Sequence, residues 1–267
     1  MTGMRYAFAG NQRIGLEVIT WLREQGHDPV AVLVPSPEGS NWSQQILDEC
    51  SFLPVESQLV GLPASEDFQE QILNLLTKLN VDYLISVHYP YILPSRVLGI
   101  PNVGCVNLHP AYLPFNRGWH TPTWAILDGT PFGATLHFMD DGVDTGDIIS
   151  RGQLDVEPTD TAHMLYQKVL TLEFELFKES LAALLSLNPS RVPQERTEGT
   201  AHGKKDLGDS GLLRLDPDEL VRAGDLIRRL RALTTNQISE AATIEIDGVL
   251  CQVQVNLAAS LSGLDHQ

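Results

Sequence analysis

The chain has 267 residues, 43% of them hydrophobic and 19% charged, which is enough to fill the core of one large domain with a smaller appendage. Its formal net charge is −16, from 34 acidic and 18 basic residues. This balance disfavours binding to tRNA or DNA, because phosphates are neutralised by clustered Lys and Arg. Three cysteines are too few for a disulfide framework, and neither a signal peptide nor a membrane-spanning run is recognisable, so we expect a cytoplasmic protein.

The first half of the chain alternates between short apolar runs and segments with helical spacing. Strands are expected at 5–10, 29–34, 81–87 and 104–109, and helices at 14–25 and 65–79. Strands separated by helices indicate βαβ units. We therefore predict an α/β fold with a Rossmann-like, mostly parallel sheet that is covered on both faces.

After residue 130 the pattern changes. Two strands, 132–138 and 147–154, are joined by an acidic loop and followed by a long helix over 160–185. Beyond an exposed connection at 193–210, we expect a helix at 217–233 and a β-hairpin at 242–255. Asp247 and Gly248 suit the two-residue turn of this hairpin. The chain thus ends in a small extension with a helix and a hairpin.

Asn107 and His109 lie at the end of the predicted strand 104–109, two residues apart, so their side chains face the same side. Pro110 ends the strand, and ligands bind at this edge of an open parallel sheet. An amide beside an imidazole suits acyl transfer. Asn107 would stabilise an oxyanion, and His109 would move the proton of an attacking amine. The alternative is a polar strand end that only caps turns.

The acidic loop contributes a third candidate, Asp144, which lies between two glycines. Its carboxylate is expected to orient His109 and to raise the pKa of that imidazole. Asp140, Asp141 and Asp147 are nearby, and the residues alone do not select among the four. Aspartates also favour hard cations. Because EF-hand and zinc-helix spacings are both lacking, no metal is expected.

The loop 113–122 carries candidates for substrate binding. Asn116 and Arg117 supply donors, Gly118 allows close backbone approach, and Trp119 offers a stacking surface. This set suits an anionic ligand with a flat base. The alternative is a rigid turn between prolines, with Trp119 as its hydrophobic anchor.

Asn11 and Arg13 follow the first strand at the same sheet edge and are candidates for holding a phosphate or a sugar. A plain helix N-cap is the alternative for Asn11. Neither a dinucleotide fingerprint, a P-loop nor a nucleophile elbow is present. His88 and His137 are interpreted as structural residues.

Together these motifs resemble the 10-formyltetrahydrofolate-dependent formyltransferases. The matching residues are Asn-Leu-His-Pro-Ala-Tyr-Leu-Pro-Phe-Asn-Arg-Gly at 107–118, with 133–137 and 143–147. The family's catalytic trio falls on Asn107, His109 and Asp144, so the resemblance selects Asp144 among the aspartates. It implies a formyltransferase fold, a catalytic domain over 1–190 and 10-formyltetrahydrofolate as the formyl donor.

The resemblance also implies where both substrates bind. Folate is expected at two mainly backbone-lined segments, with His88, Tyr89, Tyr91, Ile92, Leu93, Asp140 and Gly142. Segments 116–125 and 202–206 are similar to the sugar N-formyltransferase branch that uses dTDP-4-amino-4,6-dideoxyglucose in the synthesis of surface polysaccharide such as lipopolysaccharide O-antigen. This likeness adds His120, Lys204 and Lys205 to the substrate-binding candidates. In that branch the extension, here 191–267, forms a dimer contact, so a homodimer is expected.

Other functions are compatible with the sequence. They are hydrolysis of formyltetrahydrofolate, formyl transfer to another amine, and ligand binding without catalysis. A tRNA acceptor is disfavoured by the acidic charge and the short extension, and a glycinamide ribonucleotide acceptor by the chain that continues past Leu187. The sequence decides neither the position of the amine on the sugar nor the base of the nucleotide.

Overall fold

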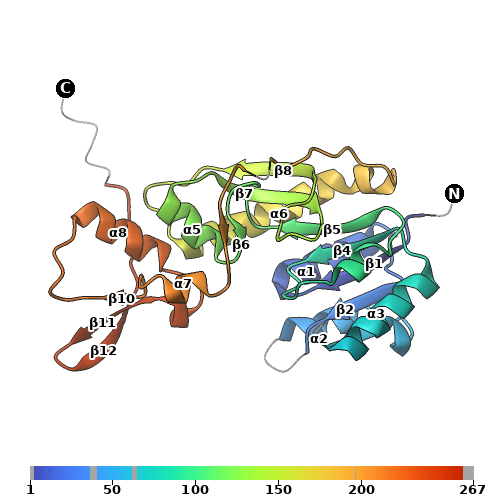
Figure 1. Cartoon of the computed structure of the whole chain (residues 1–267), viewed down its shortest axis with the longest axis horizontal. Helices are drawn as coiled ribbons and strands as arrows, with labels where there is room; N and C mark the ends of the chain where they lie inside the picture. Colours follow the sequence, from blue (N-terminus) through green and yellow to red (C-terminus); the bar gives the residue numbers. More distant parts are fainter. Residues whose placement is uncertain (1–2, 37–40, 62–64, 196, 261–267) are drawn as a thin grey trace.

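The computed structural model describes residues 3–36, 41–61, 65–195 and 197–260, and it contains a seven-stranded sheet of order β3-β2-β1-β4-β5-β7-β8 (Figure 1). The strands are β1 (Tyr6–Gly10), β2 (Ala31–Val34), β3 (Gln58–Val60), β4 (Tyr83–Val87), β5 (Gly104–His109), β7 (Phe132–Phe138) and β8 (Ile148–Leu154). The first five pair in parallel, and β7 and β8 are antiparallel additions at one edge. The predicted mostly parallel α/β sheet is confirmed.

Helices cover both faces of this sheet. They are α1 (Gln12–Glu24), α2 (Asn41–Glu49), α3 (Glu66–Leu79), α4 (Ser95–Leu98), α5 (Thr121–Asp128) and α6 (Ala162–Leu185). Alternate residues of β1 enter two separate cores: Tyr6 and Phe8 pack with α1 and α6, whereas Ala7 and Ala9 pack with α3. Both faces of the parallel strands are therefore buried, which explains their continuous apolar runs.

Helix α5 was not predicted, since the sequence assigned its first two residues to a loop. Its buried residues include Thr123, Trp124, Ala125 and Ile126, so it shows little of the apolar–polar period that reveals a surface helix. Helix α2 and the short strand β3 were also missed. By contrast, the predicted bounds of β5 and β7 are confirmed.

The C-terminal extension contains α7 (Asp206–Asp209), α8 (Ala223–Ala232) and a small sheet of β10 (Arg214–Leu215), β11 (Ala242–Ile246) and β12 (Val249–Val253). The hairpin is confirmed, with Asp247 and Gly248 both at positive φ. The predicted helix 217–233 is too long, because Asp216 accepts a hydrogen bond from the Asp218 N–H and forms a turn there. Helix α8 shares an apolar cluster with Trp124 of α5, which joins the extension to the main domain (Figure 1).

Most residues of the connection 193–210 are exposed, as predicted, but the segment also contains regular structure. Its strand β9 (Ala201–His202) pairs in parallel with β6 (Arg117–Gly118), and its residues 206–209 form α7. Polar, glycine-rich composition indicated a loop, but backbone hydrogen bonds to the 116–119 segment give it a fixed path.

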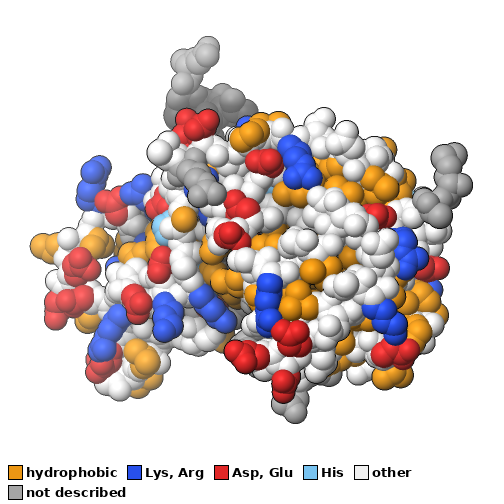
Figure 2. Space-filling view, turned by 45° about the vertical axis from the view of Figure 1, so that its right-hand side comes forward, with side chains coloured by type: hydrophobic (Ala, Val, Ile, Leu, Met, Phe, Trp, Pro, Cys, Tyr) orange, Lys and Arg blue, Asp and Glu red, His pale blue; other side chains and the backbone are white. Residues whose placement is uncertain are grey.

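Charges of both signs mix on the surface. On the face in Figure 2, Lys and Arg side chains lie among Asp and Glu and do not gather into one basic patch. Within the described ranges, no helix is both long and apolar enough to cross a bilayer.

Candidate active site

Strands β5 and β7 and the loop between β7 and β8 bring the predicted trio together. Asn107 and His109 end β5, where they pair in register with His137 and Thr135 of β7. The loop returns Asp144 towards them, and its Oδ2 lies 3.5 Å from His109 Nε2. Residues that the sequence separates widely thus form one cluster at the carboxyl edge of the parallel strands.

The Asp144 carboxylate is held in place and ionised. The Gly118 N–H donates to its Oδ2 at 2.9 Å, and His137 Nε2 lies 3.5 Å from its Oδ1. Burial raises the pKa of Asp144. His109, His137 and the Gly118 N–H together lower this pKa by more than burial raises it, so the net pKa lies well below the ordinary value. The carboxylate therefore carries its charge at neutral pH.

Asp144 raises the pKa of His109, as expected, but the net pKa lies below the ordinary value of 6.5, so the imidazole is neutral near pH 7. Burial lowers the pKa of His109 by more than Asp144 raises it, and the neighbouring His137 lowers it as well. Two acceptors, Asp144 Oδ2 and the Asn116 carbonyl oxygen, each lie 3.5 Å from Nε2. They favour the tautomer with its hydrogen on Nε2, which leaves Nδ1 as the basic atom.

His137 belongs to the cluster, although its sequence context had indicated a structural residue. Its Nε2 is 3.4 Å from Asn107 Nδ2 and 3.5 Å from Asp144 Oδ1, and only 1% of the residue is exposed. Its Nδ1 lies 2.7 Å from the Phe138 carbonyl oxygen. Because the register of β5 on β7 cannot be read from one sequence, this proximity carried no sequence signal.

Sequence reasoning also missed Glu173, which pairs with His88 and is close enough to His109 to raise the pKa of that imidazole. Both carboxylate oxygens lie 3.0 Å from His88 Nε2, and the Glu173 side chain is fully buried. Glu173 lies four residues from Val169 and from Phe177, on the apolar face of α6. A charge at that position of a helical pattern was a signal that could have identified it.

The folate candidates occupy the two predicted segments. After His88, the rings of Tyr89 and Tyr91 make an edge contact at 5.4 Å, and Leu93 is buried whereas Ile92 is 80% exposed. In the acidic loop, Asp140 accepts hydrogen bonds from the Gly142 N–H and the Thr145 hydroxyl. Asp140 thus shapes the turn that leads to Asp144.

The donors predicted at 116–118 are engaged within the protein. Asn116 is 1% exposed, and its Nδ2 donates to the Pro131 carbonyl oxygen at 3.1 Å. Arg117 is also buried, and its guanidinium donates to Gln194 Oε1. Gly118 has φ +92° and would place a Cβ 2.2 Å from the His202 carbonyl oxygen, so a glycine is required there.

The remaining substrate-binding candidates either contact the C-terminal extension or belong to it. Lys204 Nζ lies 4.6 Å from the centre of the Trp119 ring, which matches a cation–π contact. His120 Nδ1 is 3.6 Å from Glu240 Oε1, and this carboxylate raises the pKa of His120 despite partial burial. Lys205 is exposed at the start of α7.

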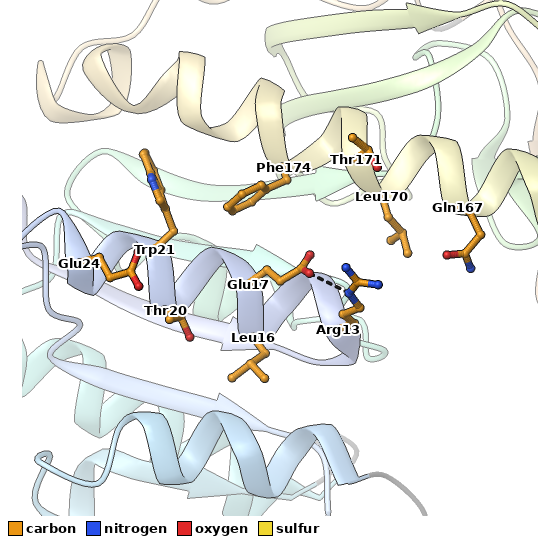
Figure 3. Close-up of a pocket in the computed structure, with 10 residues that line it drawn as sticks. All are labelled: Arg13, Leu16, Glu17, Thr20, Trp21, Glu24, Gln167, Leu170, Thr171 and Phe174. Carbon is orange, nitrogen blue, oxygen red and sulfur yellow. Dashed lines mark hydrogen bonds and ion pairs between the residues drawn. The ribbon is translucent and has the colours of Figure 1, made fainter.

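Asn11 and Arg13 lie at the start of α1, where the Asn11 N–H donates to the Val87 carbonyl oxygen at 3.1 Å. Asn11 occupies the N-cap position, where its side chain makes no capping hydrogen bond, and Arg13 pairs with Glu17 at 2.7 Å. Arg13 lines a groove of about 640 Å³ between α1 and α6, with Trp21 and Phe174 (Figure 3). No member of the trio is among the residues that line this groove.

Across the described part of the chain, no group of three or more His, Cys, Asp or Glu side chains is arranged to hold a metal ion.

Two family models match the chain. One, described as formyl transferase, matches residues 4–181, and the other, the N-formyltransferase dimerization C-terminal domain, matches residues 210–259. The dTDP-4-amino-4,6-dideoxyglucose formyltransferase of Mycobacterium tuberculosis is 32% identical over 200 residues, which cover 75% of this chain and 82% of that protein. Other curated relatives are methionyl-tRNA formyltransferases.

Solved structures confirm the predicted formyltransferase fold. A sugar N-formyltransferase from Shewanella superposes with a TM-score of 0.77 at 22% identity, covering 96% of this chain and 99% of that one. The N-formyltransferase of Helicobacter canadensis, in complex with folinic acid and dTDP-3-aminofucose, superposes with a TM-score of 0.64 at 17% identity, covering 92% and 85%.

Proposed function

Because the chain belongs to the formyl transferase family, we propose that it moves a formyl group from 10-formyltetrahydrofolate to the amine of a nucleotide-linked amino sugar, with dTDP-4-amino-4,6-dideoxyglucose as the preferred acceptor. The observation that carries the proposal is the contact of the His109 imidazole with the Asp144 carboxylate, beside Asn107 on the same strand. These three side chains are the proposed catalytic residues.

Each side chain has one role in direct transfer. The neutral sugar amine attacks the formyl carbon, and the negative charge that develops on the formyl oxygen is stabilised by Asn107. One N–H of the Asn107 amide faces His137, so the second is available for this oxygen. His109 accepts the amine proton at Nδ1, while Asp144 holds the opposite Nε2–H. The carbon–nitrogen bond to folate then breaks, and the proton passes to the departing folate nitrogen.

Three features support a nucleotide sugar as acceptor. The Mycobacterium tuberculosis relative is named for dTDP-4-amino-4,6-dideoxyglucose, and the Helicobacter canadensis structure holds dTDP-3-aminofucose. The Trp119 ring with Lys204 above it suits a flat base beside phosphates. The net charge of −16 disfavours the tRNA acceptor for which other relatives are named.

A panel of dTDP-, UDP- and GDP-linked 3- and 4-amino sugars with 10-formyltetrahydrofolate, analysed by product mass, tests the acceptor. A formylated dTDP-4-amino sugar as the main product supports the proposal, and another amino sugar would replace the named acceptor. Formate release without any amine would favour the hydrolase. Folate binding without release or transfer would favour a binding protein.

The proposed assembly is a homodimer formed through the extension. The matching family model is named for dimerization, and Ile246, Val249 and Leu250 of the hairpin are all more than half exposed in the single chain. Exposed apolar side chains on a short hairpin are typical of an interface. Leu250→Asp should shift the mass measured by light scattering from two chains to one, whereas Glu219→Gln, at an exposed position of the extension outside the hairpin, is the control.

We place the enzyme in the cytoplasm and its product in surface polysaccharide, such as lipopolysaccharide O-antigen. Fractionation of cells, and analysis of N-formyl sugars in the polysaccharide of a deletion strain, test these two parts separately.

A further inference from the structure

A connecting segment, residues 192–202, crosses the candidate active site between the two regions that the family models match. It is described except at residue 196. At its start, Val192 exchanges two backbone hydrogen bonds with Ile148 of β8. At its end, the Thr200 carbonyl oxygen accepts from the Arg117 N–H, and the His202 carbonyl oxygen accepts from the Trp119 N–H, each at 2.9 Å. The connecting segment is thus fixed on both sides of the cluster.

Between these two ends, the side-chain amide of Gln194 makes hydrogen bonds to both the acidic loop and Arg117, through its nitrogen and its oxygen. Its Nε2 donates to the Asp144 carbonyl oxygen at 3.0 Å and to the Gly146 carbonyl oxygen at 2.6 Å. Its Oε1 accepts from Arg117 Nε at 3.4 Å and Nη2 at 3.3 Å. One side chain therefore ties the acidic loop to the loop that carries the substrate candidates.

The acidic loop needs such a support. Asp144 has φ +52°, in the left-handed region, which is uncommon for a residue with a side chain. Its carboxylate must stay within reach of His109 while the backbone bends sharply. Hydrogen bonds to the carbonyls on both sides of Thr145 hold this bend from outside the loop.

We propose that Gln194 is a positioning residue, which fixes the acidic loop against Arg117 so that Asp144 stays in contact with His109. Its kinetic consequence rests on the proposed formyl transfer, but the positioning itself does not. The connecting segment thereby completes the active site, although it lies outside the part of the chain that matches the formyl transferase model, 4–181.

The pKa of His109 is a measure of the position of the Asp144 carboxylate. Asp144 faces it from the acidic loop, His137 from β7 and Glu173 from α6. Of these three groups, only Asp144 belongs to the loop that Gln194 holds. Because Asp144 raises the pKa of His109, a displaced Asp144 should lower that pKa further.

Three variants separate positioning from general stability. Gln194→Met keeps the size of the side chain and removes both donor and acceptor. Gln194→Glu keeps the acceptor for Arg117 but places a carboxylate against two carbonyl oxygens. Glu195→Met is the matched control, because Glu195 is an exposed neighbour on the same segment.

In steady-state assays we expect Gln194→Met and Gln194→Glu each to lower kcat by about 10- to 100-fold with little change in KM, since a displacement near 1 Å costs rates of that order. In nuclear magnetic resonance titrations of the free protein, Gln194→Met should lower the His109 midpoint, and Glu195→Met should change neither measurement. Thermal unfolding verifies that each variant is folded.

An unchanged His109 midpoint in Gln194→Met would overturn the proposal, and so would full activity of Gln194→Glu. If the wild-type protein formylates no amino sugar but the midpoint still moves, the proposed function fails and the positioning role stands. A change of KM alone would assign Gln194 to Arg117 and substrate binding, and would also overturn it.

Discussion

Two histidines lie at the carboxyl ends of the neighbouring strands β4 and β5: His88 directly follows β4, and His109 is the last residue of β5. Each is paired with a carboxylate in a different way. His88 meets both oxygens of Glu173 at 3.0 Å, and this carboxylate is fully buried on a helix. His109 meets one oxygen of Asp144 at 3.5 Å, and this carboxylate comes from a loop and is 14% exposed. The same two chemical groups thus form a closed pair in one place and an open pair in the other.

The difference between the two pairs suggests different roles, one in the stability of the fold and one in the reaction. In the closed pair both carboxylate oxygens of the fully buried Glu173 contact one imidazole nitrogen, so the pair can hold α6 against the end of β4. The open pair keeps an imidazole nitrogen available and a carboxylate that is charged at neutral pH. We therefore expect the open pair to control turnover and the closed pair to control the free energy of unfolding.

The largest effect should come from the open pair. His109→Ala, or Asn107→Ala beside it, should lower kcat by about 10²- to 10⁴-fold, because the base or the oxyanion donor is lost. The melting temperature should change little. Turnover by purified protein, with a melting curve as the control, measures this, and near-normal turnover of either variant would contradict the catalytic assignment.

The closed pair should show the opposite behaviour. Glu173→Ala should lower the free energy of unfolding by about 3 kcal/mol, because His88 is left buried without its partner. Glu173→Gln should cost less, since its amide oxygen can still accept from His88. Glu175→Ala, at an exposed position of the same helix, is the matched control and should be nearly neutral. Urea unfolding tells these apart, and equal losses at positions 173 and 175 would remove the contrast.

The pH dependence of the open pair has a definite sign. The pKa of His109 is lowered from 6.5, so the free base is present at neutral pH and is lost only as the pH falls below that value. We expect kcat/KM to stay level near pH 7 and to decline with a midpoint under 6.5. Asp144→Asn removes a carboxylate that raises this pKa, and should therefore move the midpoint lower and reduce kcat. A midpoint above 6.5 in the wild-type protein would contradict the neutral imidazole.

A third pair, His120 with Glu240, should give the smallest effect. It joins the main domain to the extension at 3.6 Å and is partly exposed. Because the pKa of His120 is raised above 6.5, the pair stabilises the fold below that pH and loses its effect as pH rises through the raised value. Glu240→Gln should cost about 0.5 kcal/mol at pH 5.5 and nothing measurable at pH 9. Equal unfolding curves of variant and wild type at pH 5.5 would show that the pair contributes nothing.

The contrast also shows which residues a sequence reveals. Asn107 and His109 were predictable because strand alternation and a following proline are local features. Asp144 could be chosen among its neighbours only through family resemblance, since the fold of a loop decides which carboxylate reaches the imidazole. His137 depends on strand register, and Gln194 on a connection that composition alone describes as exposed. The contacts of His137 and Gln194 join residues that are far apart in the sequence, and such contacts cannot be inferred from a single sequence.

The secondary-structure elements divide in the same way, into those with a local sequence pattern and those without one. The periodic elements β5, β7 and α6 were located from their patterns, whereas α5, buried along most of its length, was not. The effect of Asp144 on the pKa of His109 was predictable from the sequence, whereas the larger lowering by burial was not, because the degree of burial is a property of the assembled protein.

Gly118 has a consequence for attempts to change the acceptor by directed evolution. Its N–H binds the Asp144 carboxylate while its α-carbon lies against the His202 backbone, so any side chain there would disturb both contacts. Libraries that randomise residues 116–120 should return Gly118 in every active clone. To obtain variants that accept new sugars, Trp119 and Lys204 are better positions to randomise, because their side chains can vary without moving the backbone at Gly118 that binds Asp144.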